Sequence, residues 1–211
     1  MNAANHTSTS HAGHMIHRDD EGSRMGMWLF LFTEVILFGG LFAVYAVYRF
    51  MHPEDFHHAS AELSLFFGAA NTVILLTSSL TVAMSITAIQ KGDKKKSLIL
   101  LGLTLVFALA FLVNKYFEYS AKIEHGLFPG TEHFFELPHG EAQFFYLYFF
   151  MTGLHGLHIL VGLIILSFMA VYIMRGTITQ DNYTLLENGG LYWHLVDVIW
   201  IFLFPLLYLI K

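Results

Sequence analysis

Five long apolar stretches alternate with short polar segments along the chain. About 20 apolar residues suffice for a helix to cross the hydrocarbon core of a bilayer, and each stretch reaches that length. The pattern therefore predicts an all-α membrane protein, a bundle of five transmembrane helices. The fourth stretch is longer than the core requires, so we expect its helix to be tilted. The predicted spans are residues 25–50, 63–89, 98–119, 143–174 and 191–210.

The segment before the first span, residues 1–24, is polar and rich in Ser, Thr, Asn and His. A tract of this composition cannot bury enough apolar surface to order itself. We therefore expect a disordered tail over 1–24 and a five-helix transmembrane domain over 25–211. A metal-binding tail is the alternative, and its candidate ligands are the irregularly spaced His6, His11, His14 and His17.

Basic residues are distributed unequally between the two sides of the membrane. Five spans place residues 1–24, the KGDKKK turn at 91–96 and the loop 175–190 on one side. That side holds most of the Lys and Arg residues, whereas the opposite loops carry mainly acids and His. Because basic loops remain in the cytoplasm, we expect a cytoplasmic N-terminus and an external C-terminus.

Composition narrows the function classes. Hydrophobic residues make up 55% of the chain and charged residues only 13%, against about 25% charged in an average protein. The chain has no cysteine, which excludes disulfides, thiolate metal sites and a cysteine nucleophile. The net charge of -5 is spread among the loops and leaves no basic footprint for nucleic acid.

Glu34 is the most informative residue of the first span. At about 1.5 Å rise per residue it lies roughly 13 Å from the start of that span, near the middle of the bilayer. A carboxyl group at that depth costs about 2.5–3.5 kcal/mol on insertion scales, so it is expected to face protein or a polar cavity. It is either part of a functional site or a neutral acid that hydrogen-bonds a neighbouring helix.

The fourth span contains the sequence MTGLHGLHILVG at 151–162. His155 and His158 are three residues apart, so we expect them to share one face of the helix. They are possible haem or metal ligands, but such a pair is usually joined by further His or acidic ligands. His194 is a possible haem partner, although its predicted depth differs. We expect buried hydrogen-bonding histidines at a protein interface and no metal site.

Two further polar pairs occur inside predicted spans. His194 and Asp197 begin the fifth span at i,i+3 spacing, which suits proton entry, a lipid head group or a structural ion pair. Lys115 and Glu118 lie near the end of the third span with the same spacing. They are expected to pair with each other, unless Lys115 extends to the interface. Both pairs are structural by default, and no nucleophile–base–orienter set is visible.

In combination, these motifs resemble subunit III of the haem–copper respiratory oxidases. MGMWLFLFTEVILFGGLF, with Glu34, is similar to the family's early helix and its buried glutamate. MTGLHGLHILVG, with His155 and His158, and YWHLVDVIWIFLFPLLYLI, with His194 and Asp197, are similar to two later helices. KYFEY at 115–119 resembles a weaker pattern in which we expect Gln in place of Lys115. The resemblance covers the chain from about residue 24 onward.

The resemblance implies a short, five-helix bacterial form that lacks the first two helices of longer members. It implies a non-catalytic subunit in the bacterial inner membrane, with no haem or copper of its own. Haem and copper would be held by partner subunits. Such a subunit packs on catalytic subunit I and other oxidase subunits, holds phospholipid, and supports proton uptake and long-lived turnover.

Three alternatives remain open at the level of sequence. Within the family, the complex is either a cytochrome c oxidase or part of a quinol oxidase or nitric oxide reductase system. A stand-alone proton or small-solute conduit would use Glu34, His155, His158 and Asp197. A membrane b-type cytochrome would be coloured when purified.

Overall fold

The computed structural model describes residues 20–131 and 133–210. Each of its five long helices is long and apolar enough to cross a membrane. This confirms the predicted all-α fold and makes the chain a multi-pass membrane protein. The histidines of the predicted tail and the remainder of residues 1–19 lie outside the described residues. The long helices are α1 (Asp20–Met51), α3 (Leu65–Gln90), α4 (Lys94–Glu124), α5 (His139–Met174) and α6 (Thr184–Phe204).

Three short helical elements lie at one end of the bundle. The predicted connector after the first span contains the helix α2 (Pro53–Ala61). Proline suits the first turn because its missing N–H is not needed there, and Glu54 and Asp55 favour the positive end of the helix dipole. The other two elements are the 3-10 turn η1 (His133–Glu136) and the π-helical turn η2 (Pro205–Leu209).

Several helices extend beyond the predicted spans, because the hydropathy pattern marks only the apolar part of each helix. The helix α1 begins at Asp20, five residues before the predicted span. Similarly, α4 begins within the KGDKKK segment, where the Asp93 side chain accepts a hydrogen bond from the Lys96 N–H at 3.0 Å. The helix α6 begins at Thr184, seven residues before the predicted span.

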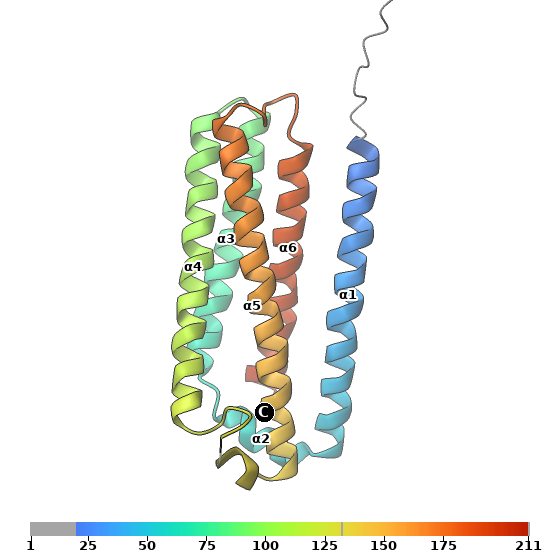
Figure 1. The fold of residues 1–211 in the computed structure, drawn as a ribbon, viewed down its shortest axis with the longest axis vertical. Helices are drawn as coiled ribbons and strands as arrows, with labels where there is room; N and C mark the ends of the chain where they lie inside the picture. Colours follow the sequence, from blue (N-terminus) through green and yellow to red (C-terminus); the bar gives the residue numbers. More distant parts are fainter. Residues whose placement is uncertain (1–19, 132, 211) are drawn as a thin grey trace, which may run out of the picture.

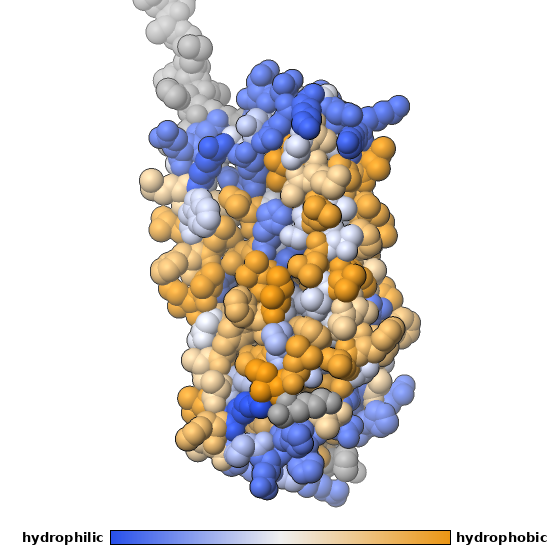
Figure 2. Space-filling model, turned by 180° about the vertical axis from the view of Figure 1, so that it is seen from behind, coloured by the Kyte–Doolittle hydropathy of each residue, from blue (hydrophilic) through white to orange (hydrophobic). Residues whose placement is uncertain are grey.

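Figure 1 shows the helices side by side, with the turn between α3 and α4 at the same end as the start of α1. We call this the lysine end, after Lys91 and Lys94–Lys96, and the opposite end the α2 end. A broad apolar band lies between two hydrophilic ends on the face in Figure 2. That distribution is expected of a protein that crosses a bilayer.

Polar side chains of α3 join it to α4. The hydroxyls of Thr81 and Thr104 lie 2.7 Å apart, and those of Ser85 and Ser97 lie 2.8 Å apart. Small hydroxyl residues allow close approach of membrane helices and hydrogen bonds across the interface.

The helix α1 is less embedded than the others. Its buried residues are Leu31, Phe38 and Tyr45, which form one narrow stripe at a spacing of seven residues. This stripe faces α5 and α6, and in Figure 1 the helix stands beside the remaining four. Many of its apolar side chains are exposed, so polar contacts have a larger share in holding α1 in place.

Candidate functional site

Glu34 and His158 form a polar contact between α1 and α5. The Glu34 Oε2 atom lies 2.9 Å from His158 Nε2, and each side chain is 14% exposed. The second ring nitrogen of His158 lies 2.8 Å from the carbonyl oxygen of Leu154 on the same helix. Since one nitrogen is oriented by the backbone, the other is held toward the carboxyl group. Glu34 thus faces protein, as predicted from its depth.

His155 does not share this contact. Its side chain is fully buried, and neither ring nitrogen has a hydrogen-bond partner among the described residues. The ring lies between Phe111 and Trp200, with centroid distances of 5.6 and 5.2 Å. Because the two histidines diverge around α5, the structure does not bring them together as ligands of one ion.

His194 and Asp197 also differ from the prediction, because no ion pair joins them in the described structure. His194 Nδ1 lies 2.6 Å from the hydroxyl of Ser79 on α3. Asp197 is 2% exposed, and its carboxyl oxygens have no hydrogen-bond partner within residues 20–131 and 133–210. His194 lies about 15 Å along α6 from its first residue, Thr184.

Lys115 and Glu118 pair as predicted, at 3.0 Å between Nζ and Oε2. Lys115 does not extend to the interface, since it is 7% exposed. The other carboxylate oxygen, Oε1, accepts hydrogen bonds from Tyr148, at 2.8 Å, and from Tyr208. These partners come from α5 and η2, so the cluster joins three segments of the chain. Both carboxylate oxygens of Glu118 therefore accept hydrogen bonds, which offset the cost of burying an ion pair.

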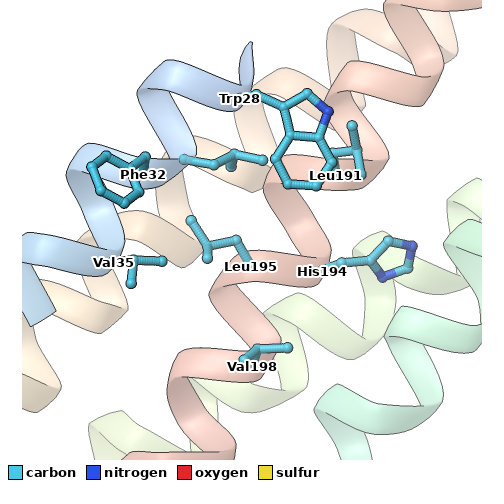
Figure 3. A pocket seen from close by; sticks show the side chains of 8 residues that line it. Trp28, Phe32, Val35, Leu191, His194, Leu195 and Val198 are labelled. Carbon is cyan, nitrogen blue, oxygen red and sulfur yellow. The ribbon is translucent and has the colours of Figure 1, made fainter. Parts of the chain in front are cut away.

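A groove separates the lysine-end halves of α1 and α6 (Figure 3). Its inner part is a cavity of about 310 Å³ whose lining is almost entirely apolar. Trp28, Phe32 and Val35 line it from α1, and Leu195 and Val198 line it from α6.

A second cavity, of about 350 Å³, adjoins the first at the lysine end and shares Trp28, Leu191 and His194 with it. Arg24 and Glu187 line this outer part and pair at 2.7 Å. The two cavities together form a groove with one charged end and one apolar end, which matches the shape of an amphiphile.

The polar side chains inside the bundle can form hydrogen bonds and exchange protons. Among residues 20–131 and 133–210, no group of three or more His, Cys, Asp or Glu side chains is placed to hold a metal ion. The polar residues instead act in pairs between helices. This arrangement suits a subunit whose polar groups fasten helices to each other.

Comparison with known proteins assigns the fold and these motifs to one family. A family model described as "Cytochrome c oxidase subunit III" matches residues 4–211. The chain belongs to this family. It is 34% identical over 195 residues to "Cytochrome c oxidase subunit 3" of Thermostichus vulcanus, covering 92% of this chain and 90% of that protein.

Two further relatives have the same extent. "Cytochrome c oxidase subunit 3" of Synechocystis is 34% identical over 207 residues, which cover 98% of this chain and 83% of the relative. "Cytochrome bo(3) ubiquinol oxidase subunit 3" of Pseudomonas aeruginosa is 30% identical over 195 residues, or 92% and 88% of the two chains. Subunits III of haem–copper oxidases therefore resemble this chain over almost its whole length.

Some residues of the intramembrane sites were missing from the sequence-based candidates for this subunit III. Tyr148 and Tyr208 complete the Lys115–Glu118 cluster, and Ser79 is the partner of His194. A buried lysine–glutamate pair indicates that further hydrogen-bond partners exist, but it does not identify them, because they lie on other helices. For Ser79 the only signal was the unusual number of hydroxyl residues in its span.

Proposed function

We propose that this chain is a non-catalytic subunit of a haem–copper terminal oxidase in the bacterial inner membrane. In this proposal it packs on catalytic subunit I with its lysine end toward the cytoplasm, and partner subunits hold the haem and copper. The supporting observation is that Glu34, His158 and Glu118 are all engaged by other parts of the same chain. Side chains committed to such contacts fasten helices and are not free to act on oxygen.

Purification through this chain in mild detergent tests the proposal. We expect further oxidase subunits to co-purify, together with the visible spectrum of haem, and we expect the isolated chain to be colourless. Deletion of the chain should leave oxygen reduction intact, slow proton uptake and shorten the working life of the complex. Loss of oxygen reduction in a complex that retains its haem and copper would contradict a non-catalytic role.

Cytochrome c is the proposed electron donor of the complex, and quinol is the second candidate. The second is supported by the Pseudomonas aeruginosa relative, which is named a ubiquinol oxidase subunit. Because electrons enter through other subunits, the discriminating measurement is turnover of the purified complex with reduced cytochrome c and with ubiquinol. A co-purifying subunit with a dinuclear copper centre would favour cytochrome c.

The groove between α1 and α6 is the proposed site for a phospholipid. Its apolar part would accept an acyl chain, and the Arg24–Glu187 pair at the lysine end would lie at head-group level. Val198 lines the groove and is 45% exposed, whereas Ile201, one turn further along α6, is 41% exposed and does not line it. This gives a matched pair of variants.

Val198→Trp should fill the groove and reduce the phospholipid that is retained per complex, measured by mass spectrometry of lipid extracts. Ile201→Trp adds the same bulk to the helix surface and should leave retention unchanged. Equal retention in both variants would show that the groove is not the lipid site.

Support of proton uptake is proposed for His194 and Asp197. His194 lines the groove and contacts Ser79, and Asp197 lies one turn deeper in α6. Replacing both with Leu should lower oxidase turnover more at alkaline pH, where protons are scarce, than at acidic pH. Thr81→Ala is the control, since it removes a buried α3 hydroxyl that instead contacts Thr104. Wild-type turnover of the double variant at every pH would make the two residues structural.

A further inference from the structure

The Lys115 ammonium group lies inside a cage of aromatic rings. Its Nζ atom is 4.8 Å from the centroid of the Trp200 ring and 5.3 to 5.8 Å from those of Tyr148, Tyr208 and Tyr119. The faces of aromatic rings attract cations, and this attraction is stronger where water is excluded. Trp200 and Tyr148 are fully buried and Lys115 is 7% exposed, so most of the cage is shielded from solvent.

Hydrogen bonds complete the cage. Lys115 donates to Glu118 Oε2 at 3.0 Å and to the Tyr208 hydroxyl at 2.9 Å. Tyr208 in turn donates to Glu118 Oε1. An ammonium group has three donors and a carboxylate has only acceptors. The site therefore offers the anion, the hydroxyl and the rings that suit a primary alkylammonium ion.

The turn η2 connects this cage to α1. Tyr208 is the cage residue of η2, and the carbonyl oxygens beside it are held from the other side. Tyr45 donates to the carbonyl of Leu206 at 2.9 Å, and Arg49 donates to that of Ile210 at 2.7 Å. These two hydrogen bonds tie the α2 end of α1 to η2 and to the residue that follows it.

We propose that the cage is an alkylammonium-binding site, occupied by the chain's own Lys115, that holds η2 and through it the α2 end of α1. The positive charge is the essential property of the occupant. Lys115 acts here as a positioning residue, because it contacts neither a substrate nor a cofactor. This role is independent of the electron donor, of lipid binding and of proton uptake.

A single cysteine can report the position of η2. The chain has no cysteine, and Leu207 is fully buried within η2. In the purified oxidase complex, Leu207→Cys should react slowly with N-ethylmaleimide. Adding Lys115→Ala should accelerate this labelling by about tenfold or more, because a desolvated cation–π cage is lost. Lys115→Met and Lys115→Gln restore bulk without charge and should also label rapidly.

Adding a small molecule to the Lys115→Ala variant tests whether the charge or the volume of the lost side chain holds η2. With Lys115→Ala, n-propylammonium should restore slow labelling, since the neutral amine can enter the membrane and take up a proton in the cage. The uncharged n-propanol should not restore it. Lys122→Ala, which removes another buried lysine whose ammonium donates to the carbonyl of Glu62, should not respond to the amine.

Labelling at the wild-type rate in Lys115→Ala or Lys115→Gln, or equal rescue by n-propanol, would overturn the proposal. If Lys115→Ala fails to assemble, Lys115→Gln and Tyr208→Phe provide the same labelling comparison. Co-purification of the chain with haem-containing subunits is measured in parallel. Its loss would contradict the assignment to an oxidase, whereas unchanged labelling in a complex that still contains haem would contradict the role of the cage alone.

Discussion

The Glu34–His158 contact should contribute measurably more to the free energy of unfolding than a surface ion pair does. The perturbation is a double-mutant cycle with Glu34→Ala, His158→Ala and the double variant. The two side chains meet at 2.9 Å and are each 14% exposed. Near that depth α1 also buries Leu31 and Phe38. Burial of apolar surface adds little here, because lipid tails are as apolar as the helix interface.

The magnitude follows from the type of bond. Interhelical hydrogen bonds in membranes contribute about 0.6 kcal/mol on average and up to about 1.7, and hydrogen bonds to charged groups contribute about 1.5–3. We therefore expect a coupling free energy of about 1–2 kcal/mol for Glu34 with His158. Each single alanine variant should cost more than this coupling suggests, because it leaves a polar partner unsatisfied at mid-depth.

The assay is reversible unfolding of the chain in mixed micelles titrated with dodecyl sulfate, applied to all four members of the cycle. Glu34→Gln is a further control, since it keeps shape and hydrogen bonding and should cost less than Glu34→Ala. Single effects that add to within about 0.3–0.5 kcal/mol in the double variant would mean that the residues are energetically independent. The reasoning that α1 depends on this polar contact would then be refuted.

Three further outcomes are expected. Gly162→Ala should destabilise the chain by about 1–3 kcal/mol, because its new Cβ would lie 2.8 Å from the ring of fully buried Trp193. Gly156→Ala has open space around the new atom and should stay within about 0.5 kcal/mol in the same unfolding titration. Arg24→Gln should cost less than about 1 kcal/mol, and the difference from wild type should shrink further in high salt, because the pair with Glu187 is partly exposed. Asp197→Leu should raise the free energy of unfolding, because it removes a buried carboxyl group without a hydrogen-bond partner among the described residues. The same variant should lower oxidase turnover at alkaline pH, and unchanged turnover would count against a role of Asp197 in proton uptake.

The sequence by itself determined the number, order and approximate extent of the membrane helices. An apolar run of about 20 residues has few alternatives in a bilayer, because every backbone polar group must be satisfied within the helix. The depth of Glu34 followed from counting residues, and its need for a protein partner followed from the cost of an exposed acid. The i,i+3 pairing of Lys115 with Glu118 was also predictable, because both residues lie on one helix.

Only the tertiary structure decided which polar residues meet. His158 is 124 residues from Glu34, and Tyr208 is 93 residues from Lys115. A helix that is apolar on all sides carries no stripe to indicate which face is turned inward. The sequence therefore could not show that His155 and His158 diverge. Where α6 packs against α3, His194 has Ser79 as its partner, and no ion pair joins it to Asp197 in the described part of the chain. These contacts depend on helix rotation and depth, which side-chain packing between helices sets and which hydropathy does not encode.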